Sequence, residues 1–231
     1  MTANPPTDGI HLAEEFLDRS TPASRVRAIL LRFPALSPAI VLLIAVIVFG
    51  LINDRFLDPN NLSLIAQQVA IVGTVAAAQT IIILTAGIDL SVGAAMVLSS
   101  MVMAQLAAAE GGLPAVAALF VGFVIAVATG FLNGTLVTRL KLPPFIATLG
   151  TLNIFVALTL LYSGGQTIIG PDLPALLTWT GQSIEVAGVR VTAGVLIMIL
   201  MYVILAYMLG KTAWGRHVYA VGDDKEAARL A

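Results

Sequence analysis

The stretch Val-Leu-Leu-Ile-Ala-Val-Ile-Val, residues 41–48, decides the fold class because it is apolar at every position. Backbone polar groups must be paired within the protein in lipid, so a spanning segment is a helix or a strand of a closed barrel. Barrel strands alternate polar and apolar side chains, and this stretch does not. It lies within residues 33–52, which contain no charged side chain. A helix of about 20 apolar residues spans the hydrocarbon core of a bilayer, so the stretch predicts a transmembrane helix.

Five further tracts of at least 20 residues lack Asp, Glu, Lys and Arg, and they cover residues 59–88, 90–109, 111–138, 142–171 and 191–210. Only 11% of the residues are charged and 58% are hydrophobic, and the mean hydropathy is +0.97. The sequence therefore predicts an all-α, polytopic helical membrane protein with about six transmembrane helices. The expected spans are Phe33–Ile52, Leu62–Thr85, Val92–Ala109, Leu113–Thr138, Phe145–Tyr162 and Ala193–Leu209.

The basic residues predict the orientation, because Lys and Arg are concentrated in cytoplasmic loops. If the six spans alternate in direction, ten of the twelve basic residues fall on one side: Arg19, Arg25, Arg27, Arg32, Arg139, Lys141, Lys211, Arg216, Lys225 and Arg229. Arg55 and Arg190 fall on the other side. Both chain ends are therefore expected in the cytoplasm, and the loop at residues 164–191 outside it. This predicts a cytoplasmic tail at 1–32 with a short helix near His11–Arg19, a transmembrane domain at 33–210 and a cytoplasmic segment at 211–231.

The sequence lacks the residues that several classes of protein need for their function. The net charge of −1 provides no basic field for nucleic acid. Cys is absent, and His11 and His217 lie outside the spans, so neither a metal cluster nor a Ser–His pair is expected in the membrane. Gly210-Lys211-Thr212 resembles the end of a phosphate-binding loop, but Leu205 stands where that motif requires its first glycine. We therefore expect no catalytic residue, metal or cofactor, and predict that the protein is not an enzyme.

The segment Gly87–Gly93 places the carboxylate of Asp89 between two apolar tracts, with a glycine at each end. One interpretation is that Asp89 or Ser91 caps the following helix. The other is that the segment is a broken helix beside a translocation path, since an ionisable group in a membrane is expensive and commonly functional. The candidates for this path or helix break are Gly87, Asp89, Ser91, Gly93 and Asn133 of the fourth span. Asn133 can instead form a hydrogen bond across a helix contact.

Small residues recur every four positions in the fourth span, at Gly122, Ala126, Gly130 and Gly134. Such a stripe lies along one helix face and lets a second helix approach closely. We therefore predict a helix-packing role for these four residues, without a role in ligand binding.

The stretch after the sixth span contains a second helix signal. Asp223 or Asp224 is expected to cap a helix that begins near Lys225. A short exposed helix in this place is either a solvated tail or a docking element, and its length and charge do not distinguish the two.

Taken together, four stretches resemble the permease subunits of bacterial ABC importers for monosaccharides of the ribose, xylose and fructose type. These stretches are Ala86–Gly93, Gly130–Gly134 with Asn133, Leu142–Thr151 with its double proline, and Tyr219–Leu230. The resemblance extends from about Leu36 to the end of the chain.

The resemblance implies a multi-pass protein of the bacterial inner membrane that forms the path for a monosaccharide together with a second permease subunit. An extracytoplasmic sugar-binding protein would deliver the sugar, and a separate cytoplasmic ABC ATPase would power its movement. The ATPase-coupling residues that it implies are Gly222, Glu226, Ala227, Ala228 and Arg229. Members of the family continue with more membrane helices, so the chain resembles a member truncated at its C-terminus.

Two alternatives remain at this stage. A stand-alone six-helix secondary transporter or pore is the first, but ion-coupled transport usually needs buried ionisable groups, and Asp89 is the one obvious candidate in the spans. An intramembrane enzyme is the second, and it lacks an evident acid–base partner for Asp89 or Ser91.

Overall fold

A computed structural model describes residues 29–33, 35–108, 111–186 and 189–230. The short helix expected near His11–Arg19 lies outside these residues, as does most of the N-terminal tail. The chain divides into two units, Met1–Asp58 and Pro59–Ala231. The first unit contains the apolar helix α3 (Leu36–Ile52). The ring of Phe49 on this helix lies 5.7 Å from the ring of Phe56 in the segment that follows.

The second unit is built from five long apolar helices and several short elements. The long helices are α4 (Pro59–Leu84), α5 (Val92–Ala108), α6 (Ala115–Thr138), α7 (Pro144–Ser163) and α9 (Ala193–Lys211). Between α7 and α9 lie the turns η1 (Gly170–Asp172), α8 (Ala175–Thr178) and η2 (Trp179–Gly181), followed by the strands β1 (Ser183–Val186) and β2 (Val189–Thr192). The short helices α10 (Ala213–Asp223) and α11 (Lys225–Leu230) follow α9.

The predicted fold class is confirmed. Four of the helices, α4, α6, α7 and α9, are long and apolar enough to cross a membrane, and α3 and α5 are apolar helices of 17 residues. This length is at the lower limit for a span. All six expected spans therefore correspond to helices, with ends that differ by a few residues. For example, α4 begins at Pro59 rather than Leu62, because proline is well tolerated in the first helical turn.

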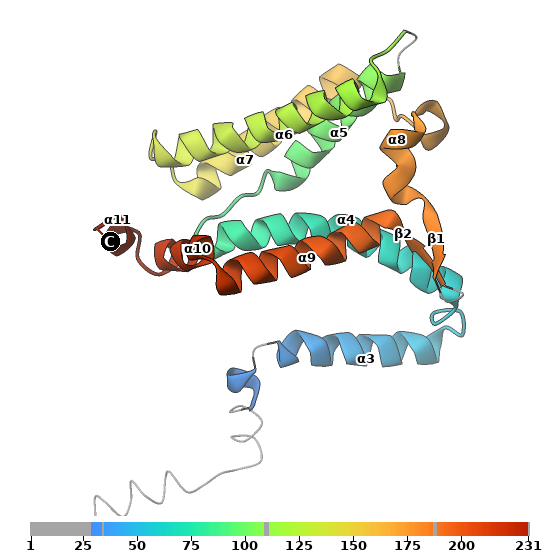
Figure 1. Cartoon of the computed structure of the whole chain (residues 1–231), viewed down its shortest axis with the longest axis horizontal. Coiled ribbons are helices and arrows are strands. Elements are labelled where there is room, and N and C mark those ends of the chain that lie inside the picture. The colour runs from blue at the N-terminus through green and yellow to red at the C-terminus, as the bar shows by residue number, and fades with distance from the viewer. Residues whose placement is uncertain (1–28, 34, 109–110, 187–188, 231) are drawn as a thin grey trace, which may run out of the picture. The chain divides into compact units, whose positions relative to one another are not determined.

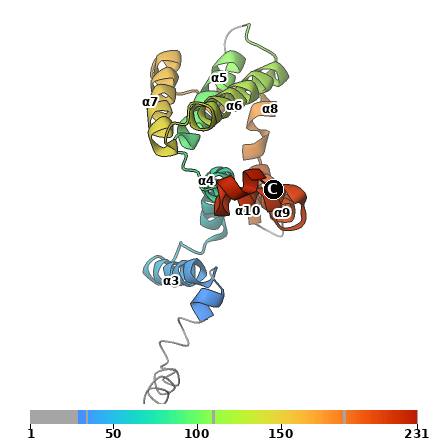
Figure 2. The ribbon, with the colours of Figure 1, turned by 90° about the vertical axis from the view of Figure 1, so that its left-hand side faces the viewer.

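The long helices of the second unit pack in two groups. Helices α5, α6 and α7 contact one another, whereas α4 contacts α9 and β2 (Figures 1 and 2). In the second group, the hydroxyl of Tyr202 on α9 donates to the carbonyl oxygen of Gly73 on α4 at 3.0 Å. The hydroxyl of Ser63 near the start of α4 donates to the carbonyl oxygen of Arg190 on β2. Side-chain hydroxyls that donate to backbone carbonyls thus join α9 to α4 and α4 to β2.

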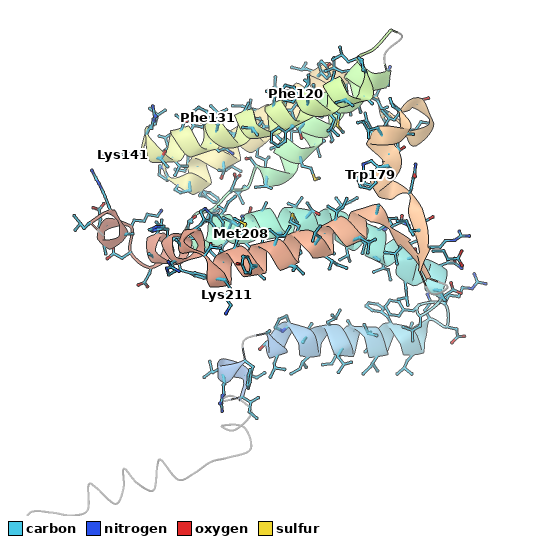
Figure 3. The ribbon with its side chains drawn as sticks, viewed as in Figure 1. Phe120, Phe131, Lys141, Trp179, Met208 and Lys211 are labelled. Carbon is cyan, nitrogen blue, oxygen red and sulfur yellow. The ribbon has the colours of Figure 1, made fainter. Side chains whose placement is uncertain are left out.

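The burial pattern fits helices in lipid. The buried face of α7 carries a stripe with a spacing of three to four residues, at Ala147, Thr148, Thr151, Phe155 and Thr159. Large apolar side chains point outward instead: Phe120 and Phe131 on α6 are 64% and 72% exposed (Figure 3). Apart from Phe155, the buried stripe consists of small and hydroxyl-bearing residues, and such residues at helix contacts are typical of membrane proteins.

The two ends of the second unit differ in chemistry. Helices α10 and α11 lie at one end, where Figure 3 also shows Lys141 and Lys211. The opposite end carries α8, Trp179 and the antiparallel β1–β2 hairpin, in which Glu185 is paired with Arg190. The sequence predicted only a loop at residues 164–191, so the hairpin and the short helical turns are additions to that prediction.

Candidate functional site

The site begins where α4 ends, in a Schellman motif. The N–H of Gly87 donates to the carbonyl oxygen of Ile82, and the N–H of Ala86 to that of Ile83, both at 2.9 Å. These two bonds satisfy carbonyls that the helix end would otherwise leave unpaired. Ala86 has a φ of +54°, a left-handed conformation that glycine usually supplies at this position. The chain thus turns sharply after α4 and places Asp89 just before α5.

The Asp89 carboxylate is held by three hydrogen bonds from two residues. Its Oδ1 accepts from the backbone N–H and from the hydroxyl of Ser91, both at 2.7 Å. Its Oδ2 accepts from the side-chain amide of Asn133 on α6 at 3.3 Å. The same amide donates to the Ser91 hydroxyl oxygen at 2.6 Å. Asp89 therefore makes an Asx turn at the start of α5 and also connects that turn to α6.

This polar cluster is buried, with Ser91 at 0% and Asn133 at 6% exposure. The side-chain oxygen of Asn133 is buried too and has no hydrogen-bond partner among the described residues. Buried polar atoms are usually paired, so this oxygen is available to a further donor.

Helix α7 is joined to the same turn through Thr148. Its hydroxyl donates to the carbonyl oxygen of Pro144 one turn earlier, at 2.8 Å, and lies 3.4 Å from the carbonyl oxygen of Ile88. Thr148 is only 2% exposed. Both acceptors are backbone carbonyl oxygens, one within α7 and one in the turn before α5. The turn before α5 is therefore attached to both α6 and α7.

A cavity of about 770 Å³ opens beside this cluster. Its wall combines the end of α4, the turn at Gly87–Asp89, α6, α7 and the two short helices α10 and α11. The polar residues that line it are Thr85, Asp89, Asn133, Thr138, Thr148, Lys225 and Arg229. One carboxylate, two cations, an amide and three hydroxyls thus face a space between otherwise apolar helices, which can accommodate water or a polar solute.

Gly222 positions the short helices on this wall. A Cβ at Gly222 would collide with the backbone carbonyl of Leu84, the last residue of α4. Helix α10 therefore lies directly against the end of α4, two residues before the Schellman turn. The family resemblance implied a coupling role for Gly222 without indicating this contact, because Leu84 is distant in the chain.

The terminal helix α11 has the predicted cap. The carboxylate of Asp224 accepts from the N–H groups of Glu226 and Ala227 at 2.8 and 3.0 Å, so Asp224 rather than Asp223 is the capping residue. Glu226 and Ala227 are exposed, and Ala228 is half-buried. Arg229 lines the cavity together with Lys225, one turn earlier. The helix thus presents one face to the cavity and an acidic residue to the outside.

The small-residue stripe of α6 has two different environments. A Cβ at Gly122 would lie 2.9 Å from Met103 Cβ and 3.2 Å from the carbonyl oxygen of Ser99, so Gly122 permits close contact with α5. A Cβ at Gly130 or Gly134 would meet nothing within 4 Å, and both residues line the cavity. The packing interpretation therefore fits Gly122, whereas within this chain Gly130 and Gly134 widen the cavity. Ala126 is exposed.

Gly93 lies apart from the cluster. It is exposed in the first turn of α5, and a Cβ there would meet nothing within 4 Å. Sequence reasoning missed the cavity positions of Lys225 and Thr138. For Lys225, the available signal was its spacing of one helical turn from Arg229.

Comparison with known proteins identifies the family. The family described as "Branched-chain amino acid transport system / permease component" matches residues 61–231. The chain belongs to this family.

Three curated relatives of this permease have import functions in their names. The fructose import permease protein of Rhizobium meliloti is 50% identical over 202 residues, which are 86% of this chain and 56% of the relative. The ribose import permease protein of Bacillus subtilis (strain 168) is 40% identical over 196 residues, 85% of this chain and 59% of the relative. The autoinducer 2 import system permease protein of Escherichia coli (strain K12 / DH10B) is 33% identical over 206 residues, which are 87% of this chain and 58% of the relative. No solved structure matches the chain.

The resemblance to monosaccharide importer permeases is thereby confirmed, as is the expectation of a multi-pass membrane protein. The permease spans less than three fifths of the length of these relatives. The members of its family are transporters and, in general, not enzymes.

Proposed function

We propose that this chain is the transmembrane permease component of an ATP-binding-cassette importer and forms the path for a monosaccharide. The observation that carries the proposal is 50% and 40% identity to permeases named for fructose and ribose import, over 86% and 85% of the chain. The polar cavity beside Asp89 supports it, because a path for a sugar through apolar helices needs hydrogen-bonding groups along its wall. In this proposal the protein moves its substrate and catalyses no covalent reaction.

The proposed orientation places α10 and α11 in the cytoplasm of the bacterial cell, with the N-terminus on the same side of the inner membrane. Its support is the charge distribution, since Arg139, Lys141, Lys211 and Arg216 join or follow helices that end at the α10–α11 end. Arg190 lies on the hairpin at the opposite end. Basic residues are concentrated on the cytoplasmic side of membrane proteins, so the hairpin faces outward.

Three protein partners belong to the proposal. A cytoplasmic ABC ATPase docks on the exposed face of α11 at Glu226 and Ala227. An extracytoplasmic sugar-binding protein delivers substrate at the hairpin end, and a second permease subunit completes the path. The outward-facing apolar residues, such as Phe120 and Phe131, provide ample surface for lipid and for this second subunit.

The contacts around Asp89 suggest how docking couples to transport. Movement of α11 is passed to α10, and from Gly222 to the end of α4 at Leu84, because these backbones touch. The turn that follows carries Asp89, which is bonded to Asn133 on α6, and Thr148 attaches α7 to the same turn. A displacement at the cytoplasmic surface therefore reaches three spanning helices through packed and hydrogen-bonded groups.

The experiment is sugar uptake by cells that express the chain together with the other subunits of the proposed importer. We expect uptake of labelled fructose or ribose, and expect its loss when the nucleotide site of the ATPase is inactivated. Uptake that survives this inactivation would indicate the stand-alone transporter, and the absence of sugar uptake in the intact system would contradict the proposal.

A further inference from the structure

A second, smaller cavity lies at the opposite end of the α5–α6–α7 group, where α5 and α7 end. Its volume is about 250 Å³, and it is lined by Met101, Gln105, Ala108, Ser163, Gln166 and Ile168. The volume is several times the share of one water molecule in the liquid, about 30 Å³. The space can therefore hold a small organic ligand.

One residue of the cavity wall carries an unpartnered polar atom. The side-chain oxygen of Gln105 is buried and has no hydrogen-bond partner among the described residues. An amide oxygen removed from water without a partner is unfavourable, so Gln105 is suited to accept a hydrogen bond from a ligand. Nearby, Ser163 is 8% exposed, and its oxygen already accepts from the N–H of Gly165 at 3.1 Å.

The lining indicates which ligand chemistry fits. Two primary amides and one hydroxyl supply both donors and acceptors, and Met101 and Ile168 add apolar contact. None of the described residues that line this cavity is ionisable. A charged group placed here would lose hydration without gaining a counter-ion from the described lining residues, whereas each hydroxyl of a neutral polyol can donate and accept at once.

We propose that this cavity is a binding subsite for a neutral monosaccharide, with the Gln105 amide as its main polar contact. This inference rests on the proposed function and adds a location and a specificity to it. In the proposed orientation the subsite faces the side on which sugar arrives. It separates neutral sugars from their phosphorylated forms before they reach the Asp89 cavity.

The test uses the absence of cysteine from the chain. Ala108→Cys puts a single thiol in the cavity wall, and Ser183→Cys puts a control thiol on β1. Both are introduced into the complete importer in native membranes, and the rate of labelling by a small maleimide is measured. We expect D-fructose or D-ribose to slow labelling of Ala108→Cys, but not of Ser183→Cys, and D-ribose 5-phosphate to protect neither.

A second substitution tests the contact itself. Gln105→Leu in the Ala108→Cys background is expected to raise the half-protecting sugar concentration by about three- to tenfold, the effect of one neutral hydrogen bond. Gln166→Leu is a second variant expected to shift it in the same direction. Gln68→Leu is the matched control, because Gln68 is exposed on α4 and does not line the cavity. It is expected to leave the protection unchanged.

Two results would overturn the subsite. One is labelling of Ala108→Cys that no sugar slows, although the same importer transports fructose or ribose. The other is protection that responds equally to Gln105→Leu and Gln68→Leu. An importer that transports neither sugar would contradict the proposed function instead, so the two failures are distinguishable.

Discussion

Asp89 is an acidic residue whose neighbours are neutral donors. Its Oδ1 receives both Ser91 bonds and its Oδ2 receives the Asn133 amide. The capping and pathway interpretations are therefore compatible at this residue. Oδ1 accepts the bonds that fix the start of α5, and Asp89 also lines the cavity with Lys225 and Arg229.

Exchange of Asp89 and Asn133 tests their contact. Asp89→Asn keeps an oxygen for Ser91 but sets an amide against the Asn133 amide, so two donors face each other. Because hydrogen bonds to charged groups contribute about 1.5–3 kcal/mol, we expect a lower thermal unfolding midpoint in detergent. The double variant Asp89→Asn with Asn133→Asp restores one donor and one acceptor and should recover part of the loss.

The control for the exchange is the sum of the stability changes measured for the two single substitutions. A double variant no more stable than this sum would show that the two side chains do not interact. Uptake adds a separate reading: near-total loss in Asp89→Asn with normal membrane insertion would assign the carboxylate to the path.

At the scale of elements, the contact between α10 and α4 depends on the absence of a side chain at Gly222. Gly222→Ala would place a methyl group against the backbone of Leu84, and backbone cannot move as a flexible side chain can. Forced overpacking costs about 1–3 kcal/mol. We expect α10 to shift away from α4, so that sugar-dependent ATP hydrolysis falls in the reconstituted importer.

Gly210→Ala is the matched control for this prediction. Gly210 is also helical, near the end of α9, but a Cβ there would meet nothing within 4 Å. Alanine favours a helix over glycine by about 1 kcal/mol, so this variant should be as active as the parent and slightly more stable. Equal behaviour of the two variants would argue that the α10–α4 contact is unimportant.

The exposed face of α11 gives a prediction about the ATPase. Glu226 is exposed beside the Asp224 cap, and the cap bonds to its backbone N–H, so charge reversal there keeps the capping group while it alters the outer surface. We expect Glu226→Lys to abolish co-purification of the ATPase with the permease. Glu185→Lys reverses a charge on the β1–β2 hairpin instead and should leave co-purification normal. Retention of the ATPase by Glu226→Lys would count against α11 as the docking element.

The sequence predicts helices better than it predicts the turns between them. Charge-free tracts located all six apolar helices, because the bilayer imposes a minimum length on each. The hairpin was missed, although Ile184-Glu185-Val186 and Val189-Arg190-Val191 alternate as strands do. The glycines and prolines that precede it, between residues 164 and 181, made the whole region resemble an irregular loop.

The sequence could identify residues of the site but could not show which of them contact each other. Asp89, Ser91 and Asn133 stood out as polar groups in apolar surroundings, yet Asp89 and Asn133 are 44 positions apart and their bond depends on the rotation of α6. That rotation is set by packing at places such as Gly122 against Met103. For the same reason the sequence could not show which glycines of the stripe touch a helix and which border a cavity.

For the whole molecule, the distribution of charge and the arrangement of helices both favour the proposed orientation. Lys141 and Lys211 lie at the end that carries α10 and α11, and Lys225 and Arg229 belong to α11 itself. A reversed protein would place these cations outside the cell, against the usual cytoplasmic concentration of basic residues. In the proposed orientation, the cavity without ionisable lining residues would face the side from which sugar arrives, and the Asp89 cavity would face the proposed ATPase.

Cysteine accessibility tests the orientation directly, because the chain contains no native thiol. Ser183 on β1 and Ala213 at the start of α10 are both exposed in the structure, so a difference between them reports sidedness rather than burial. In intact cells we expect Ser183→Cys to react with a membrane-impermeant maleimide and Ala213→Cys to remain unlabelled. After the membrane is permeabilised both should react, which controls for the chemical accessibility of each thiol. Labelling of Ala213→Cys alone in intact cells would invert the protein, placing the Asp89 cavity and α11 outside, where no ATPase could reach them.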